Sequence, residues 1–359
     1  MALTIITFII VLSLLVIAHE FGHFIVAKRT GIKVEEFAIG FPPRIWSKKR
    51  GETEYIINAI PLGGYVKMLG EVEKSSDPRA FENQSRIVRF SVAVAGVVMN
   101  IVLAWIILSI GFMVGMSPIV SNYRDIPGKI ISSEIIIAGV LKDSVAESAG
   151  LKQMDKLIAI ENLGITHEFG SVEELSSYTK SHKGESVIVK YYRDGAEGQK
   201  NITLGTGDSP LGVSAINNGV VRATWYKAPY IALRETYEIT KYTAEFVRDL
   251  FVKIFTHGKV SDQVGGPVQI FVATGTAVRV GVMAVLQLVA ILSVNLAIIN
   301  ILPLPALDGG RILFIIVEAI ARKRIIKEQV ENVIHTIGFA LLFLVIALVT
   351  YNDIAKLIK

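Results

Sequence analysis

The first hydrophobic stretch of the chain contains the residues best suited to chemistry. His19, Glu20 and His23 form an HExxH pattern within the sequence HEFGH. On a helix, residues four apart share one face, so both imidazoles can bind one metal ion while Glu20 faces the same space. Zinc in such a site lowers the pKa of a water molecule to about 7, and a carboxylate can then move its proton to a leaving amine. The pattern therefore predicts a zinc-dependent hydrolase.

Asp308 is the best candidate for the third protein ligand that a catalytic zinc requires. It ends the third long hydrophobic stretch, at the same membrane surface as the HExxH pair. Pro303, Pro305, Gly309 and Gly310 break the helix around it and leave backbone groups without internal partners. The alternative is an aspartate that only caps the following helix outside the bilayer.

The composition is that of a membrane protein. Hydrophobic residues make up 52% of the 359 residues, and only 19% are charged. Four stretches are long and apolar enough to span a bilayer: residues 1–30, 90–116, 281–307 and 333–351. We therefore expect a polytopic α-helical membrane protein with four transmembrane helices.

Charge and cysteine content narrow the function further. The net charge is +5 without a long basic run, which favours contact with anionic membrane lipids and argues against a nucleic-acid partner. The chain contains no cysteine, which excludes a thiol protease and a cysteine-ligated zinc site.

The distribution of lysine and arginine predicts the orientation in the membrane. Basic residues follow the first stretch, precede the second, and fill a predicted loop at residues 308–332. These segments are expected on the cytoplasmic side. Both termini and the large segment between the second and third stretches then lie outside, with the catalytic residues near the cytoplasmic surface.

The segments between the hydrophobic stretches differ in kind. Residues 31–89 are rich in β-branched and aromatic residues and in turn formers, which predicts a membrane-associated β segment with a strand-like stretch at residues 55–68. Residues 130–208 alternate strands with two short helices, as a compact α+β domain does. Residues 209–280 carry aromatic residues at helical spacing and are expected to form an amphipathic juxtamembrane segment.

Three motifs, in order along nearly the whole chain, resemble the site-2 intramembrane metalloproteases, most closely the bacterial regulator of sigma-E protease group. They are HEFGH, the segment PLGGY at residues 61–65, and NxxPxPxLDGG at residues 300–310. The resemblance implies that zinc is bound by His19, His23 and Asp308, with Glu20 as the catalytic base. It also implies that the substrate backbone is held by Asn300, Pro303 and Pro305, and that residues 31–89 form a membrane-re-entrant β structure.

An edge of the 55–68 strand offers backbone groups to an unwound substrate, so we expect Ile57, Gly63 and Gly64 to contact it. Two departures from the family pattern leave the zinc site intact. Pro42 and Pro43 follow Gly40 and Phe41, where the family usually reads GFGP, and the segment from Gly96 to Asn100 lacks the usual proline after its glycine.

Residues 138–162 resemble the core of a PDZ domain, a fold that binds an extended peptide as an added strand. One such domain is expected, inserted between the second and third membrane helices. Two roles remain open for it: binding the free C-terminus of a peptide, or acting as a steric gate that keeps large ectodomains from the catalytic site.

The resemblance implies an intramembrane zinc endopeptidase that cuts single-pass membrane proteins, such as anti-sigma factors trimmed by another protease and remnant signal peptides. Two alternatives belong to other classes. A non-catalytic PDZ scaffold would not need the intact Glu20. A metal or proton transporter could use intramembrane histidine and aspartate, but four spans without a repeated half argue against it.

Overall fold

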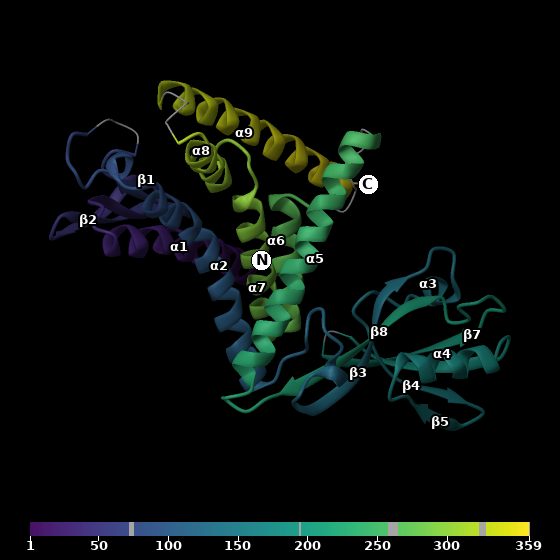
Figure 1. The fold of residues 1–359 in the computed structure, drawn as a ribbon. Coiled ribbons are helices and arrows are strands. Elements are labelled where there is room, and N and C mark those ends of the chain that lie inside the picture. Colours follow the sequence, from purple (N-terminus) through teal and green to yellow (C-terminus); the bar gives the residue numbers. More distant parts are fainter. Residues whose placement is uncertain (72–74, 194, 258–264, 323–327, 359) are drawn as a thin grey trace. The chain divides into compact units, whose positions relative to one another are not determined.

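The computed structural model describes residues 1–359 apart from residues 72–74, 194, 258–264, 323–327 and 359 (Figure 1). The chain divides into two compact units. The first unit comprises residues 1–109 and 232–359, and the second comprises residues 110–231.

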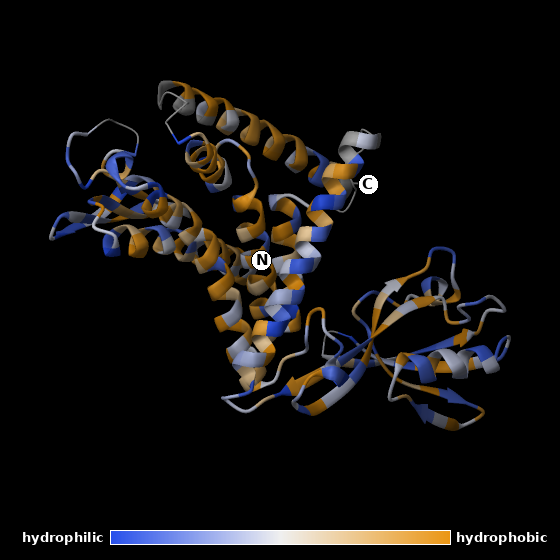
Figure 2. Ribbon diagram, in the orientation of Figure 1, coloured by the Kyte–Doolittle hydropathy of each residue, from blue (hydrophilic) through white to orange (hydrophobic). Residues whose placement is uncertain are grey.

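Four helices of the described chain are long and apolar enough to cross a membrane, which confirms the expected number of spans. They are α1 (Ala2–Arg29), α2 (Arg86–Val114), α7 (Val282–Ile301) and α9 (Glu328–Ile358). Figure 2 shows all four as mostly hydrophobic ribbons. In lipid, a helix satisfies its own backbone hydrogen bonds, so these apolar sequences have no competing structure at that depth.

The segment expected to be one amphipathic stretch at residues 209–280 consists of three different elements. These are β8 (Val213–Arg222), α5 (Ala228–His257) and α6 (Pro267–Val280). Figure 2 shows hydrophilic and hydrophobic residues interspersed along α5. Helix α6 packs on α1, where the rings of Phe8 and Phe271 meet edge to face at 5.4 Å. The expected single segment is thus a strand of the second unit followed by two helices.

Helix α8 (Asp308–Ala321) replaces the first part of the basic loop expected at residues 308–332. Ile312 and Ile315, one helical turn apart, pack against Ala93 of α2. Its Glu318 carboxylate accepts hydrogen bonds from the guanidinium of Arg89, at 2.7 and 2.8 Å. The basic cluster that suggested a loop begins only after this helix. The helical spacing of the apolar residues before it, Ile312 and Ile315, is the feature that indicates a helix here.

The β segment consists of β1 (Val34–Arg50) and β2 (Thr53–Met68), which fold against each other along most of their length. Residues 36–39 lie between the two halves of β2, and residues 54–57 lie between the two halves of β1. The sheet is fixed to α1 and α2 by buried apolar residues: Ala27, Ile32, Val34, Phe37, Val66, Met68 and Val92.

Ile57 therefore does not lie at a free edge, and that expectation was wrong. It pairs with Ile39 on one side and with Trp46 on the other. Among the described residues, the stretch from Gly64 to Met68 pairs on one side only. The sequence could not show which part of β2 lies at the edge of the sheet. Both strands are long enough to bend and pair twice, and only the pairing register determines which stretch is interior.

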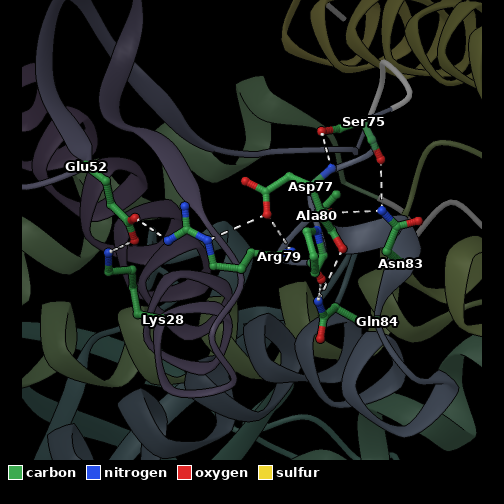
Figure 3. Close-up of polar contacts among 9 residues, drawn as sticks. Lys28, Glu52, Ser75, Asp77, Arg79, Ala80, Asn83 and Gln84 are labelled. Carbon is green, nitrogen blue, oxygen red and sulfur yellow. Dashed lines mark hydrogen bonds and ion pairs between the residues drawn. The ribbon is translucent and has the colours of Figure 1, made fainter.

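A polar network fastens the loop that follows the sheet (Figure 3). Glu52 accepts hydrogen bonds from Lys28 of α1 at 2.7 Å and from Arg79 of the loop at 2.8 Å. These two cations lower the pKa of the Glu52 carboxyl. Within the loop, the Asn83 side chain donates to the backbone carbonyls of Ser75 and Asp77. The loop is thereby tied to the end of α1 that carries the HExxH residues.

The second unit contains the α+β domain expected as a PDZ domain. Its sheet has the strand order β7-β6-β4-β3-β8, with β5 paired to β4. Its other elements are β3 (Lys129–Val140), α3 (Val145–Ser148), β4 (Lys156–Asn162), β5 (Ile165–Glu168), α4 (Val172–Ser181), β6 (Ser186–Arg193) and β7 (Ala196–Thr203), with a short 3-10 turn at Tyr123–Asp125. A second 3-10 turn, Phe81–Asn83, belongs to the first unit. Strand β8 pairs with β3 along its length, so the domain extends beyond the predicted boundary at residue 208.

Candidate active site

His19 and His23 of α1 and Asp308 of α8 bring their side-chain donors to one point. The Nε2 atoms of the two histidines are 3.2 Å apart. The Oδ2 atom of Asp308 lies 3.0 Å from the Nε2 of His19 and 3.3 Å from that of His23. Both histidines are buried. The structure thus brings together three residues that are separated by almost 290 positions in the sequence.

This geometry fits a tetrahedral zinc ion. Bonds of about 2.0–2.1 Å place neighbouring ligand atoms about 3.3 Å apart, close to the three separations observed. The Asp308 Oδ2 atom is buried and, in the described part of the chain, has no hydrogen-bond partner beyond its contacts with these two imidazoles. Three electron-pair donors facing one another are stable only around a cation. Two imidazoles and one carboxylate leave the fourth position open, as a catalytic zinc requires.

Close packing of α1 and α2 holds the two imidazoles in place. A Cβ atom added at Gly96 of α2 would lie 2.5 Å from the Nε2 of His23 and 2.6 Å from the Cε1 of His19. A Cβ added at Gly22 of α1 would lie 2.3 Å from the backbone oxygen of Ala95. Only glycine fits at these two positions. Sequence reasoning noted Gly96 without giving it a role, although a glycine in an apolar span is a signal of close helix contact.

The second ring nitrogen of His23 is also engaged. Its Nδ1 atom lies 2.8 Å from the backbone oxygen of Val92, which can accept its hydrogen. That bond leaves Nε2 unprotonated and directed at the common point, as in many metal-binding histidines. Sequence reasoning could not identify Val92, because a backbone carbonyl acceptor has no side-chain signature.

The turn before Asp308 depends on two glycines. A Cβ atom at Gly309 would lie 2.0 Å from the backbone oxygen of Leu302, and one at Gly310 would lie 2.6 Å from that of Leu304. The absence of these side chains lets the start of α8 fold onto the end of α7. Asp308 is thereby held at the start of the helix, beside the histidines of α1.

An ion pair fixes the start of α8 relative to the loop after the sheet. Arg311, one turn after Asp308 in α8, donates to Glu71 in the loop after the sheet. This ion pair ties α8 to the loop fastened by Glu52.

The free edge of the sheet passes Glu20. A Cβ atom added at Gly64 would lie 3.7 Å from the Cγ of Glu20 and 2.7 Å from the backbone oxygen of Ala38. Gly63 has a φ of +107°, and a Cβ there would meet the ring of Phe41 at 2.5 Å. These glycines bring a strand with unpaired backbone groups next to the carboxylate of the HExxH pattern.

Comparison with known proteins identifies the family. The sequence model of peptidase family M50 matches residues 7–345 of the chain. The chain belongs to this family. It is 31% identical to the zinc metalloprotease RasP of Shouchella clausii, over 429 residues and 99% of each chain. It is also 31% identical to RasP of Geobacillus kaustophilus, over 425 residues and 98% of each chain.

The family and the spanning helices together confirm that the M50 chain is an intramembrane zinc protease of a bacterial membrane. Among solved structures, the PDZ domain of an SdrC-like protein from Listeria monocytogenes matches part of the chain. It is 22% identical, covers 24% of this chain and 93% of that one, and has a TM-score of 0.21.

Of the three residues expected to hold the substrate backbone in the M50 chain, only Asn300 has a contact with a candidate zinc ligand among the described residues. The Nδ2 atom of Asn300 lies 3.3 Å from the Nε2 of His19, so this side chain borders the candidate zinc site. Pro303 is exposed in the turn between α7 and α8. Pro305 is half-buried and packs so closely on Gly338 of α9 that a Cβ there would lie 2.4 Å from the Pro305 ring.

Proposed function

We propose that His19, His23 and Asp308 bind the catalytic zinc and that Glu20 is the general base of peptide-bond hydrolysis. The observation that carries this proposal is the separation of 3.0–3.3 Å among the three donor atoms. Further support comes from the position of Glu20, one residue after His19 and beside the free edge of the sheet.

The chemistry follows from these positions. Zinc, when bound, makes a water molecule acidic enough to act as a nucleophile at neutral pH. Glu20 accepts a proton from the attacking water and delivers it to the leaving amine nitrogen. Asn300 donates from its amide to the carbonyl oxygen of the scissile bond, where negative charge develops.

We further propose that the substrate is a membrane-spanning helix that unwinds next to the sheet. A helix in lipid hides each carbonyl in an internal hydrogen bond, and the freed groups need new partners at once. The edge from Gly64 to Lys67, which pairs on one side only, can supply them by accepting the substrate as an added strand. Pro303 is exposed in the turn that leads to Asp308 and would limit the path of the substrate backbone.

Single-pass membrane proteins are the proposed substrates, with anti-sigma factors and remnant signal peptides as candidates by family resemblance. Strand β8 of the PDZ domain pairs with β3 and, at Val221, also bridges to Met116. Among the described residues, the rest of its other edge has no strand partner and can accept a peptide. Helix α4 lies beside this edge, where the Val172 amide donates to Asn217 at 2.7 Å. This arrangement supports a docking module rather than a purely steric gate.

The proposed orientation puts the termini and the PDZ domain outside the cell and the zinc site near the cytoplasm. Basic residues next to the spanning helices support it. Because the chain lacks cysteine, single cysteines can test it with a membrane-impermeant thiol reagent on intact cells. Ser177→Cys in the PDZ domain should react, and Lys48→Cys in the β segment should react only after the membrane is opened. The opposite pattern would reverse the proposed orientation.

The proposed roles predict different effects for two substitutions. Glu20→Gln should retain about one zinc per chain and lose about 100- to 10,000-fold in cleavage rate, because Glu20 is a base and not a ligand. Asp308→Ala should lower the zinc content itself. Metal analysis of the purified protein and cleavage of a membrane-embedded substrate measure both effects. Wild-type cleavage by Glu20→Gln, or full zinc occupancy in Asp308→Ala, would contradict the assignment.

A further inference from the structure

Asn100 of α2 is completely buried next to His19, and the proposed hydrolysis gives it no role. Its Nδ2 atom lies 3.4 Å from the Nδ1 of His19. Its Oδ1 atom is buried and has no hydrogen-bond partner in the described part of the chain. A buried amide oxygen without a partner is unfavourable and calls for an explanation.

The tautomer of His19 supplies that explanation. Its Nε2 atom faces His23 and Asp308, so Nε2 is the nitrogen directed at the metal. A neutral imidazole that binds a metal through Nε2 carries its hydrogen on Nδ1, and this hydrogen needs an acceptor. An amide N–H facing the Nδ1–H would put two donors in contact. A half-turn of the Asn100 amide, which leaves its shape unchanged, presents the unpaired Oδ1 to the Nδ1–H instead.

Asn300 cannot take this role in the same position. Its Nδ2 atom lies 3.4 Å from the Nδ1 of His19 and 3.3 Å from the Nε2. A group almost equally distant from both ring nitrogens does not lie along the Nδ1–H bond. Asn100, by contrast, contacts only Nδ1 among the described hydrogen-bond contacts.

The backbone of Asn100 is itself anchored. Its carbonyl oxygen accepts a hydrogen bond from the hydroxyl of Ser293 on α7 at 2.8 Å, and Ser293 is completely buried. Helices α2 and α7 are therefore joined at the level of His19. This anchor fixes the depth at which the Asn100 amide meets the imidazole.

We propose that Asn100 is a positioning residue of the zinc site, whose Oδ1 accepts the Nδ1 hydrogen of His19 and holds this imidazole with Nε2 toward the metal. The inference rests on the proposed role of His19 as a ligand. It gives the two histidines equivalent support: His23 is oriented by the Val92 carbonyl, and His19 by the Asn100 side chain.

Zinc affinity measured by competition with a chromogenic chelator tests this role in the purified full-length protein. Asn100→Leu removes the acceptor at similar volume and should weaken zinc binding about 10- to 100-fold. Asn100→Asp keeps an acceptor of the same shape and should bind zinc at least as tightly as the wild type. Ser109→Ala removes a different buried polar group of α2, a hydroxyl that donates to the Trp105 carbonyl, and should leave the affinity unchanged.

Two outcomes overturn the proposal: wild-type affinity in Asn100→Leu, or an equal loss in Asn100→Asp. Nitrogen-15 NMR of labelled histidine gives a second measurement if Asn100→Leu does not fold. The Nδ1 resonance of His19 should shift in Asn100→Asp, because a carboxylate accepts more strongly than an amide, and an unchanged resonance contradicts the proposal. His19→Ala tests the ligand assignment separately. If His19 is not a zinc ligand, this variant keeps its zinc.

Discussion

The candidate zinc site and the neighbouring sheet edge both depend on a glycine, and they use it in opposite ways. Gly96 lets the backbone of α2 press against two imidazoles that are less than 10% exposed. Gly64 lets β2 pass close to Glu20 in the stretch where this strand pairs on one side only. Gly96 thus allows tight packing around the candidate zinc site, whereas Gly64 lies in a stretch of strand that another strand can still join.

The difference matches the demands of the two regions. Zinc ligands must be held to within a few tenths of an ångström, so their surroundings are packed and their remaining polar groups are bonded. A substrate backbone must enter and leave, so the strand that receives it has to keep unpaired groups. Damage to the packed region should therefore affect metal binding first, whereas damage at the open edge should affect cleavage alone.

Gly96→Ala should have the largest effect of the substitutions that test this contrast. The new methyl group would lie 2.5 Å from the His23 Nε2 and displace both imidazoles. We expect zinc affinity to fall at least about tenfold and cleavage to fall about 100-fold, because small displacements of reacting groups are that costly. Chelator competition and a cleavage assay measure the two quantities.

Gly139→Ala provides the matched control for this substitution. An added Cβ at Gly139 meets no atom within 4 Å, and the backbone there has no positive φ. Zinc content and cleavage should remain at wild-type values. Tight zinc binding in Gly96→Ala would show that α2 does not hold the imidazoles.

The contrast also explains how much the sequence could predict. His19, Glu20, His23 and Asp308 were predicted from the sequence because metal chemistry requires particular side chains at particular spacings, and the structure brings the donor atoms of His19, His23 and Asp308 together. Gly96 acts through a missing side chain, so its role depends on which helix lies opposite.

The sheet shows the same limit more clearly. Alternation and turn residues predicted strands at residues 31–89, but the register places Ile57 in the interior and Gly64 at the edge. Two long strands with exposed apolar faces have several registers of similar local energy, and contacts with α1 decide among them. Pairing between distant residues is therefore the part of this fold that sequence patterns left open.

Gly64→Ala should have a smaller effect, confined to the open edge. The added Cβ would lie 2.7 Å from the Ala38 oxygen and 3.7 Å from the Glu20 Cγ, so the strand must shift away from the carboxylate. We expect about a tenfold loss of cleavage with zinc content unchanged. Loss of zinc from this variant would mean that the edge is part of the packed metal site.

Substrate variants sharpen the same point. A glycine near the cleaved bond should speed hydrolysis relative to leucine, since helix opening is about 1 kcal/mol easier at glycine. Methylation of single substrate amides should slow cleavage at alternate positions only, because every second amide of an added strand faces the protein edge. Equal rates across all the methylated substrates would argue against strand addition.

The smallest expected effect comes from Glu318, which holds α8 and hence Asp308 from a distance. Burial opposes ionisation of this carboxyl, but hydrogen bonds from Arg89 and Arg86 outweigh the burial and lower its pKa. A group whose pKa is lower in the folded state stabilises that state above its unfolded pKa, and this contribution is lost as pH falls through the folded value. Glu318→Gln should thus be less stable than the wild type at pH 7, by about 1–3 kcal/mol.

The stability difference between Glu318→Gln and the wild type should shrink as the pH falls below the usual range of a glutamate, because the wild-type carboxyl then becomes protonated. Unfolding curves of both proteins at several pH values measure this difference directly, and groups common to both proteins largely cancel. Zinc content at neutral pH should stay near the wild-type value, since Gly309 and Gly310 still fold the start of α8 onto α7. A difference independent of pH would show that the Glu318 contacts act through packing and not through charge.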